Sequence, residues 1–400
     1  MNGNPPTNPE HGATRDVELV APQLAAYRAR GFWPEPQHEA VLRAALLAPP
    51  QLTDALASWQ ELDRESLDHT TLTILPLLYR NLELHDEAPE LRHQLAGYYR
   101  WSWHRNQLLL AATKHALGTL HEVGVTPTMM KGVPLTLDIY RDMGVRVMRD
   151  VDLVVRRADL DRALHALTGA GWTAQRALTP ELTASLGGIE LRNSRGLALD
   201  LHWHVLQDSY DTSVDETLID GAEPLTVGSQ QVAVLNPTDH LLLVITHGLS
   251  WSADPPIHWI TDAVMLLRLR GDDIDWQRLT DLSSRTRTLH TLQSGLGFLR
   301  QRLGEELPAG CARLLAARPH RTERLAMWFA QRSAAPWLWG RAPLVAASYL
   351  RSRRAKGRWP TPLGLLRFLG ARADCSPGEW LRRAFRVHTR RLFRIARTGR

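Results

Sequence analysis

The sequence predicts an α+β fold, in which a small mixed β-sheet core is embedded between N-terminal helices and a mainly helical C-terminal region. Apolar residues recur at helical spacing from Pro22 to Glu122. Short β-branched runs separated by turn residues follow, from Thr128 to Val205. After Pro237 the helical spacing returns and continues to the end of the chain. Helices that flank a group of strands in this way are typical of the α+β class.

The N-terminal helical part is expected to hold several short helices from Pro22 to about Glu87 and one long helix from Pro89 to Glu122. The strands expected after it are 128–131, 147–155, 189–192 and 197–205, with helices at 134–140 and around 160–167. The last two strands are joined by the turn residues Asn193 to Gly196, which predict a hairpin.

Five segments are expected along the chain. They are a disordered tail (1–20), an N-terminal helical region (21–90), the α+β core (91–235), a helical domain (236–350) and a basic helical tail (351–400).

Composition narrows the class of protein. The chain has 400 residues, of which 44% are hydrophobic and 22% charged, as is usual for a globular protein. Residues Met1 to Asp16 hold no basic stretch followed by an apolar one, so no secretory signal is expected. No apolar run approaches the roughly 20 residues that a membrane span needs. Cys311 and Cys375 have no CxxC spacing, which suits a reducing compartment. We therefore expect a cytoplasmic protein.

Positive charge is concentrated at the C-terminus. The net charge is +6, and residues 351–400 hold fifteen Arg or Lys residues but only two acids, Asp374 and Glu379. Such a segment attracts polyanions such as RNA, although a solvated Arg-rich helix face explains it equally well. The chain has only three lysines, Lys114, Lys131 and Lys356. A lysine inside a structured motif therefore indicates that an ammonium group is wanted there.

Asp150 and Asp152 form the most informative motif. They lie two residues apart in an apolar, β-branched run, so on a strand both project from one face while Val151, Leu153 and Val155 face the core. Neighbouring buried carboxylates repel each other and lose hydration. Divalent cations neutralise such pairs in enzymes that act on phosphates. The motif therefore indicates phosphoryl or nucleotidyl chemistry.

A third carboxylate is expected from the second strand of the hairpin. There Asp200 shares a face with His202 and His204, while Leu201 and Trp203 take the other face. With three carboxylates, Asp150 and Asp152 would hold two Mg²⁺ ions, and Asp200 would help to deprotonate the attacking hydroxyl.

Donors for phosphate oxygens are expected nearby. Lys131 and Gly132 follow the first strand and Arg146 precedes the acidic strand, so all three are candidate nucleotide-binding residues. His202 and His247 are candidates for the substrate pocket, although His247 also fits a simple helix-packing role.

Two other interpretations of these motifs stay open. A lone Asp-x-Asp also occurs on solvated edge strands and in calcium loops. His202 and His204 have a spacing that can bind zinc, but no third ligand is evident.

Several spaced elements together resemble one known family. They are Lys131-Gly132, Tyr140 with Asp142, Arg146, Asp150-x-Asp152, Asp200-x-His202-Trp203, and, in a later helical part, His240, His247, Trp259 and Asp262. In this order they resemble the uncharacterised nucleotidyltransferase family of bacteria, a branch of the polymerase β-like superfamily. The similarity spans approximately residues 90–290.

The resemblance implies that Asp150, Asp152 and Asp200 are the carboxylates of a nucleotidyltransferase site. The wider superfamily has Gly-Ser where this chain has Gly132-Val133, so Lys131 would substitute for the missing hydroxyl. Some members of the family accompany peptide natural-product gene clusters, which implies natural-product biosynthesis with a small-molecule or modified-peptide acceptor.

The expected activity is transfer of a nucleoside monophosphate from an NTP such as ATP to a hydroxyl or phosphate of a small-molecule, peptide or RNA acceptor, with release of pyrophosphate. One alternative is a non-catalytic protein of the same fold that binds a nucleotide or a peptide. Another is an RNA-binding protein that uses residues 351–400.

Overall fold

The computed structural model divides into two compact units, each assembled from several stretches of the chain. The helical unit comprises residues 1–103, 144–147 and 237–331, and the sheet unit comprises residues 104–143, 148–236 and 332–400. The structure describes residues 33–60, 68–207, 209–228, 230–250, 257–332, 338–372 and 375–382. The predicted disordered tail (1–20) and the end of the predicted basic tail (383–400) lie outside the described residues.

The N-terminal helices make the first part of the helical unit. They are α2 (Pro36–Leu46), α3 (Gln51–Gln60), α4 (His69–Leu72), α5 (Leu75–Leu84) and the beginning of α6 (Pro89–Glu122). Pro36 is the first residue of α2, where its fixed φ suits a helix and its missing N–H costs no bond. Both α3 and α5 pack on α2, whose residues Val41 and Leu42 are fully buried.

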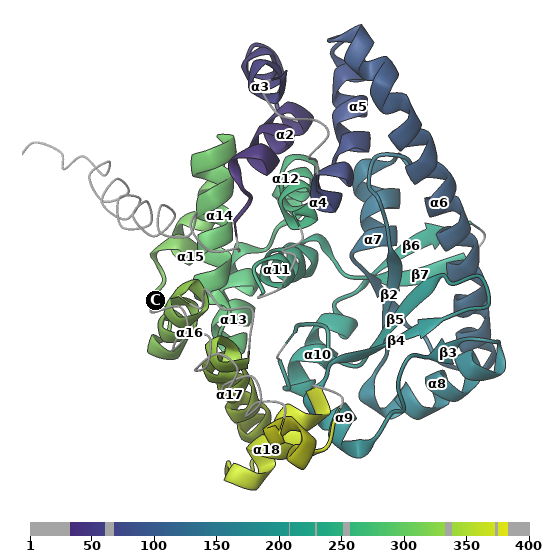
Figure 1. Ribbon diagram of the computed structural model, residues 1–400, viewed down its shortest axis with the longest axis vertical. Helices are drawn as coiled ribbons and strands as arrows, with labels where there is room; N and C mark the ends of the chain where they lie inside the picture. The colour runs from purple at the N-terminus through teal and green to yellow at the C-terminus, as the bar shows by residue number, and fades with distance from the viewer. Residues whose placement is uncertain are drawn as a thin grey trace, which may run out of the picture. The chain divides into compact units, whose positions relative to one another are not determined.

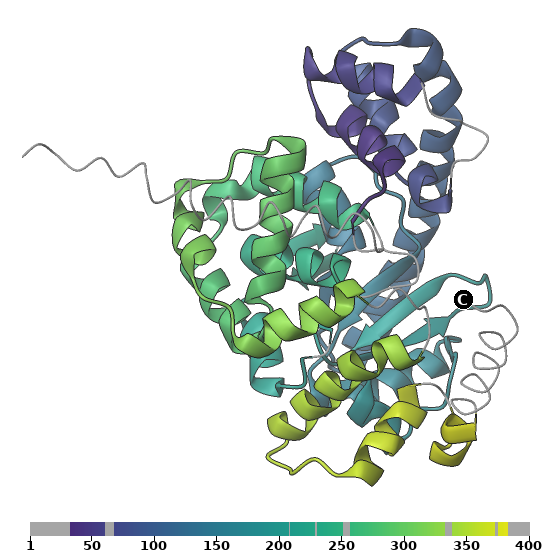
Figure 2. The same ribbon diagram turned by 60° about the vertical axis from the view of Figure 1, so that its left-hand side comes forward.

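The second part of the helical unit is drawn mainly in green in Figure 2. It comprises α11 (Pro237–Gly248), α12 (His258–Arg270), α13 (Trp276–Thr286), α14 (Leu289–Leu303), α15 (Ala312–Ala316) and nearly all of α16 (Arg321–Arg332). Helices α12, α13 and α14 pack around α11, and ten of its twelve residues are buried. The buried Asp239 of α11 is neutralised by Arg278 of α13, at 2.7 Å.

The sheet unit contains a mixed seven-stranded sheet in the order β3-β4-β5-β2-β1-β7-β6 (Figure 1). The strands are β1 (Thr128–Met130), β2 (Asp150–Val154), β3 (Thr173–Ala174), β4 (Gly188–Arg192), β5 (Ala198–His202), β6 (Glu223–Val227) and β7 (Gln230–Val234). β2 is parallel to β5 and β1 to β7, whereas the other neighbouring pairs are antiparallel. The predicted α+β class with a mixed sheet is confirmed.

The helical elements of the sheet unit connect these strands or follow them. They are the rest of α6, α7 (Gly132–Pro134), the π-helical segment η2 (Leu135–Tyr140), α8 (Leu160–Gly169), α9 (Pro180–Ser185), α10 (Thr212–Asp220), α17 (Leu338–Ala355) and α18 (Pro362–Arg372). Both α17 and α18 pack on α9, which leads into β4.

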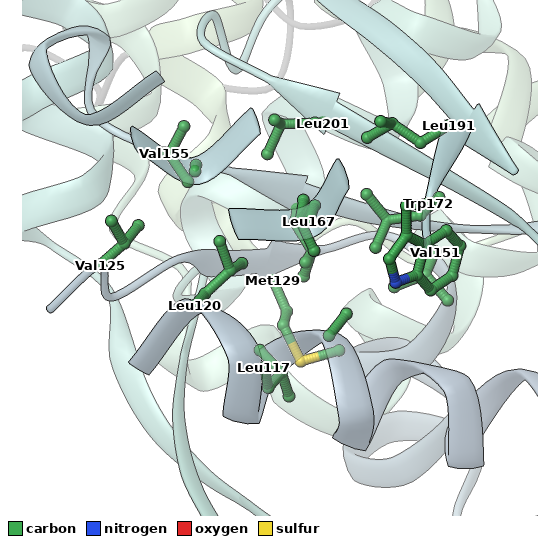
Figure 3. Packing of buried hydrophobic residues seen from close by; sticks show 14 of the residues in the cluster. Leu117, Leu120, Val125, Met129, Val151, Val155, Leu167, Trp172, Leu191 and Leu201 are labelled. Carbon is green, nitrogen blue, oxygen red and sulfur yellow. The ribbon is translucent and has the colours of Figure 1, made fainter. Parts of the chain in front are cut away.

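One apolar core lies between the sheet and the helices α6 and α8. Leu117 and Leu120 of α6 and Leu167 of α8 pack on Val151 of β2 and Leu201 of β5 (Figure 3). Leu153, Val155 and Trp203 belong to the same cluster, as the alternation in the sequence predicts. The opposite face of β2 and β5 is thus left for polar side chains.

Some elements differ from the sequence-based prediction. The strand expected at 147–155 is shorter, and the helix expected at 134–140 is a short α-helical turn followed by η2, which ends where Arg141 adopts φ 53°. The hairpin of β6 and β7 was not predicted, because β6 lies at the edge of the sheet, contains Pro224 and lacks a clear apolar alternation. Among the described residues, no helix combines the length and the apolar character needed to cross a membrane.

Candidate metal centre

The parallel pairing of β2 with β5 brings two of the predicted carboxylates together. In this register Asp152 lies opposite Asp200, and Leu153 lies opposite Leu201. Because the two leucines point into the core, the two aspartates share the other face of the sheet. Asp150 lies two residues before Asp152 and therefore on the same face.

Asp152, Asp200 and His202 form a compact set of potential ligands. Each offers one ligand atom, and the three atoms lie within 4.8 Å of one another. The predicted meeting of carboxylates from separate strands is thus present for Asp152 and Asp200. His202, expected to line the substrate pocket or alternatively to bind zinc with His204, belongs to this ligand set.

Asp200 is a buried carboxylate with little compensation. Burial, together with the negative charges of Asp152 and Asp150, raises its pKa to about 7. Its Oδ1 atom is buried and has no hydrogen-bond partner among the described residues. A buried carboxylate oxygen without a donor is costly, and a cation held by the three ligands would satisfy it. The residues present therefore fit a divalent cation.

Lys131 supplies a positive charge to the same cluster. Its Nζ lies 2.6 Å from Oδ1 of Asp152, and both side chains are largely buried. Burial alone would lower the pKa of Lys131, but the charges of Asp152, Asp150 and Asp200 outweigh it and raise that pKa. For Asp152, burial is likewise outweighed, here by Lys131 and His202, and its pKa falls below its ordinary value. Asp152 is therefore ionised.

The backbone at Lys131 is strained. The residue directly follows β1 and has φ 55° and ψ −118°, a combination that turns usually give to glycine. Such a conformation costs a non-glycine residue about 1–3 kcal/mol and is often kept at functional sites. The chain thus tolerates strain at the one residue that brings an ammonium group to Asp152.

His202 is held as a neutral ring beside the carboxylates. Burial lowers its pKa, so the imidazole carries no charge at neutral pH, which is the form that binds metals. Its Nε2 lies 3.0 Å from Oδ1 of Asp152. On its other side the ring packs against Gly188 of β4, where an added Cβ would lie only 2.7 Å from Nδ1.

His204 has a different hydrogen-bond partner from His202. Its Nδ1 lies 2.6 Å from Oδ2 of Asp215 at the start of α10, and both side chains are buried. Asp215 also accepts a hydrogen bond from the backbone of Val205. The ligand set described above contains His202 but not His204, so the two histidines do not form the zinc pair that their spacing allowed.

Two acids near the cluster were missed by sequence reasoning. Glu190 of β4 lies opposite Asp200 and helps to raise the pKa of that residue. Counting outward from the predicted turn at 193–196 gives only an approximate signal, because it pairs Glu190 with Leu199, the residue next to Asp200. Asp215 offered no such signal, because its partner His204 lies eleven residues away across an irregular segment.

The other predicted site residues have different surroundings. Gly132 begins α7 directly after Lys131, and its carbonyl accepts a hydrogen bond from Thr136. Arg146 belongs to the helical unit, where its guanidinium makes two 2.8 Å hydrogen bonds to the carboxylate of Asp262. His247 lies on α11 of the same unit. Their contacts with a nucleotide or substrate stay predictions.

The model of a family described as uncharacterised nucleotidyltransferase matches residues 57–304, which is more than half of the chain. No curated protein matches. Among solved structures, an antigenic nucleotidyltransferase-like protein from Paracoccidioides brasiliensis is similar at 14% identity, over 51% of this chain and 94% of that one. The TM-score is 0.30, so that likeness supports no argument here.

Proposed function

The chain belongs to the uncharacterised nucleotidyltransferase family, and on that premise we propose that it moves a nucleoside monophosphate from an NTP to an acceptor in a metal-dependent reaction. The observation that carries the proposal is the ligand set of Asp152, Asp200 and His202, within 4.8 Å. The buried Oδ1 of Asp200, which lacks a donor among the described residues, supports a cation at this place. A bound divalent cation would supply Lewis-acid stabilisation of the phosphate charge.

Residues of the protein itself would accept the proton and hold the cations in the proposed reaction. An acceptor oxygen attacks the α-phosphorus, the bond from that phosphorus to the β-phosphate oxygen breaks, and pyrophosphate leaves. Asp200 is the proposed acceptor of the hydroxyl proton, because a pKa of about 7 suits a general base at neutral pH. Asp150 and Asp152, of which Asp152 is ionised, would hold the cations.

Binding of the NTP is assigned to the donors that the sequence motifs contain. We assign Lys131, Gly132 and Arg146 to the phosphates, and His202 and His247 to the walls of the substrate pocket. The cation is proposed to be Mg²⁺, with two ions in the complete complex, and ATP is the first NTP to test.

The acceptor is proposed to be a hydroxyl or phosphate of a small molecule or modified peptide, in a cytoplasmic biosynthetic reaction. RNA is the second candidate. In its favour, the described helices α17 and α18 contain no Asp or Glu, and exposed basic side chains occur at Arg354 of α17 and at Lys356 and Arg358 in the segment that follows it. Trp359 between these helices is 86% exposed and offers a surface on which a base can stack.

Radiolabel transfer tests the proposed function. Each NTP, labelled at the α-phosphate, is incubated with the protein, Mg²⁺ and a small-molecule, peptide or RNA pool. We expect label in one pool only, and its loss in Asp152→Ala and Asp150→Ala. Asp161→Ala, which removes an exposed carboxylate of α8, is the matched control and should retain transfer. Labelling that survives Asp152→Ala would refute the site assignment.

A further inference from the structure

The candidate metal centre already contains one positive charge, that of Lys131. Asp150, Asp152 and Asp200 contribute up to three negative charges on one face of the sheet, and His202 is neutral. Lys131 contributes one positive charge, and its ammonium already lies on Oδ1 of Asp152. Lys131 therefore occupies a carboxylate oxygen that a bound cation would also use.

Both the backbone conformation and the burial of Lys131 fix the position of its ammonium group. Its backbone adopts φ 55°, a conformation that glycine would adopt without strain. Its side chain is only 15% exposed and lies against a carboxylate that is 5% exposed. A strained backbone and a buried ion pair together fix the ammonium within the group of carboxylates.

We propose that Lys131 is a built-in cation that occupies part of the metal centre until a nucleotide binds. In the nucleotide-free protein it competes with metal for Asp152 and limits the centre to one divalent cation. When an NTP binds, its phosphates attract the ammonium, Asp152 is released, and a second cation enters with the nucleotide. This inference rests on the proposed function and concerns the order in which the same site is filled.

The inference predicts opposite effects of one substitution on two ligands. Removing the ammonium takes away the positive charge beside Asp152, so the nucleotide-free protein should bind metal more tightly. The same substitution removes a phosphate donor, so the NTP should bind more weakly. A lysine that only binds phosphate would produce the second effect without the first.

The test measures Mn²⁺ binding to the nucleotide-free protein by electron paramagnetic resonance. Wild type should bind one ion per chain, and Lys131→Met should bind Mn²⁺ at least about tenfold more tightly, because an adjacent positive charge is removed in a partly buried site. Lys131→Arg keeps the charge and should remain near wild type. Lys114→Met, which removes the exposed lysine of α6, is the matched control and should also remain unchanged.

A second variant separates the effect of losing the ammonium group from the effect of misfolding. Lys131→Gly removes the ammonium and relieves the backbone strain, so it should fold and bind Mn²⁺ as Lys131→Met does. Unchanged or weaker Mn²⁺ binding in both variants would overturn the inference, as would tighter binding in Lys131→Arg.

The two proposals fail in different ways. If Asp152→Ala abolishes both metal binding and label transfer while Lys131→Met leaves metal binding unchanged, only the role of Lys131 is wrong. If Asp152→Ala retains transfer, the proposed function itself is wrong.

Discussion

Asp152 and Asp200 lie directly opposite each other on the parallel strands β2 and β5, yet their environments shift their pKa values in opposite directions. Asp152 has Lys131 and His202 beside it, and these outweigh its burial. Asp200 is buried beside two other carboxylates, and its Oδ1 has no donor among the described residues. Environments that separate two like groups in this way divide the roles of ion holder and proton acceptor between them.

The raised pKa of Asp200 predicts how stability depends on pH in the metal-free protein. Folding raises this pKa from 3.8 to about 7, so the contribution of Asp200 is most favourable below pH 4 and is lost as the pH rises to 7. At about 1.4 kcal/mol for each pKa unit, the loss is at most on the order of 4 kcal/mol.

Asp200→Asn cannot ionise and should therefore gain stability relative to wild type as the pH rises. Urea unfolding in the presence of EDTA at pH 5 and pH 8 measures the difference. Asp161→Asn is the control for removal of an exposed carboxylate. An equal advantage of Asp200→Asn at both pH values would contradict the prediction.

Gly188 is expected to position the His202 ring. An added Cβ would lie 2.7 Å from Nδ1 of His202 and 3.1 Å from two further ring atoms, so Gly188→Ala must displace the ring from its place beside Asp152. We expect metal affinity to fall by about tenfold or more, as happens when a ligand loses its supporting contact. Co²⁺ absorption measures both affinity and nitrogen ligation.

Gly169→Ala is the matched control for Gly188→Ala, because a Cβ at the end of α8 meets nothing within 4 Å. A Co²⁺ spectrum of Gly188→Ala that is identical to wild type would show that His202 is not a ligand.

The sequence predicted the local part of this site and the meeting of Asp152 with Asp200, but not that His202 completes the ligand set. The alternation of Asp150 and Asp152 with apolar residues revealed a two-faced strand, and the same pattern placed Asp200 and His202 on one face of β5. Local patterns of this kind depend only on neighbours in the chain. They therefore predicted the core-facing residues of both strands.

Pairings between distant segments could not be read from those patterns. The parallel contact of β2 with β5 crosses α8, β3, α9 and β4, and only this register shows that His202 joins the ligand set. The ion pair of Arg146 with Asp262 joins residues 116 positions apart. Charge alone suggested a phosphate ligand at Arg146, because the sequence does not show which anion lies closest.

The pair of Arg146 and Asp262 predicts a structural effect that differs from loss of a nucleotide contact. Both side chains are at most 10% exposed and make two hydrogen bonds with each other. Arg146→Ala would leave a buried carboxylate without its cation, which typically costs about 3–5 kcal/mol. Urea unfolding of this variant measures the cost.

The double variant Arg146→Met with Asp262→Leu should recover much of that stability, since it removes both charges. If Arg146→Ala instead unfolds like wild type but binds NTP weakly, Arg146 is the phosphate ligand that its sequence position suggests.

Tyr210 is expected to hold α17 and α18 against α9 within the sheet unit. Its hydroxyl lies 2.9 Å from Oγ of Ser348 on α17, accepts a hydrogen bond from Arg372 of α18 at 3.2 Å and donates to the carbonyl of Ser185 on α9 at 3.3 Å. Tyr210→Phe leaves these buried groups without their common partner, so the protein should lose about 1–3 kcal/mol.

Hydrogen exchange distinguishes a local loosening of α17 and α18 from a general loss of stability. In Tyr210→Phe, amides of α17 and α18 should exchange faster than those of β2 and β5, because the lost bonds hold only the helices. Tyr79→Phe, which removes an exposed hydroxyl bonded to Glu83, should change neither region. Uniformly faster exchange throughout the sheet unit would mean that α17 and α18 unfold together with the sheet, and that the metal centre depends on their attachment.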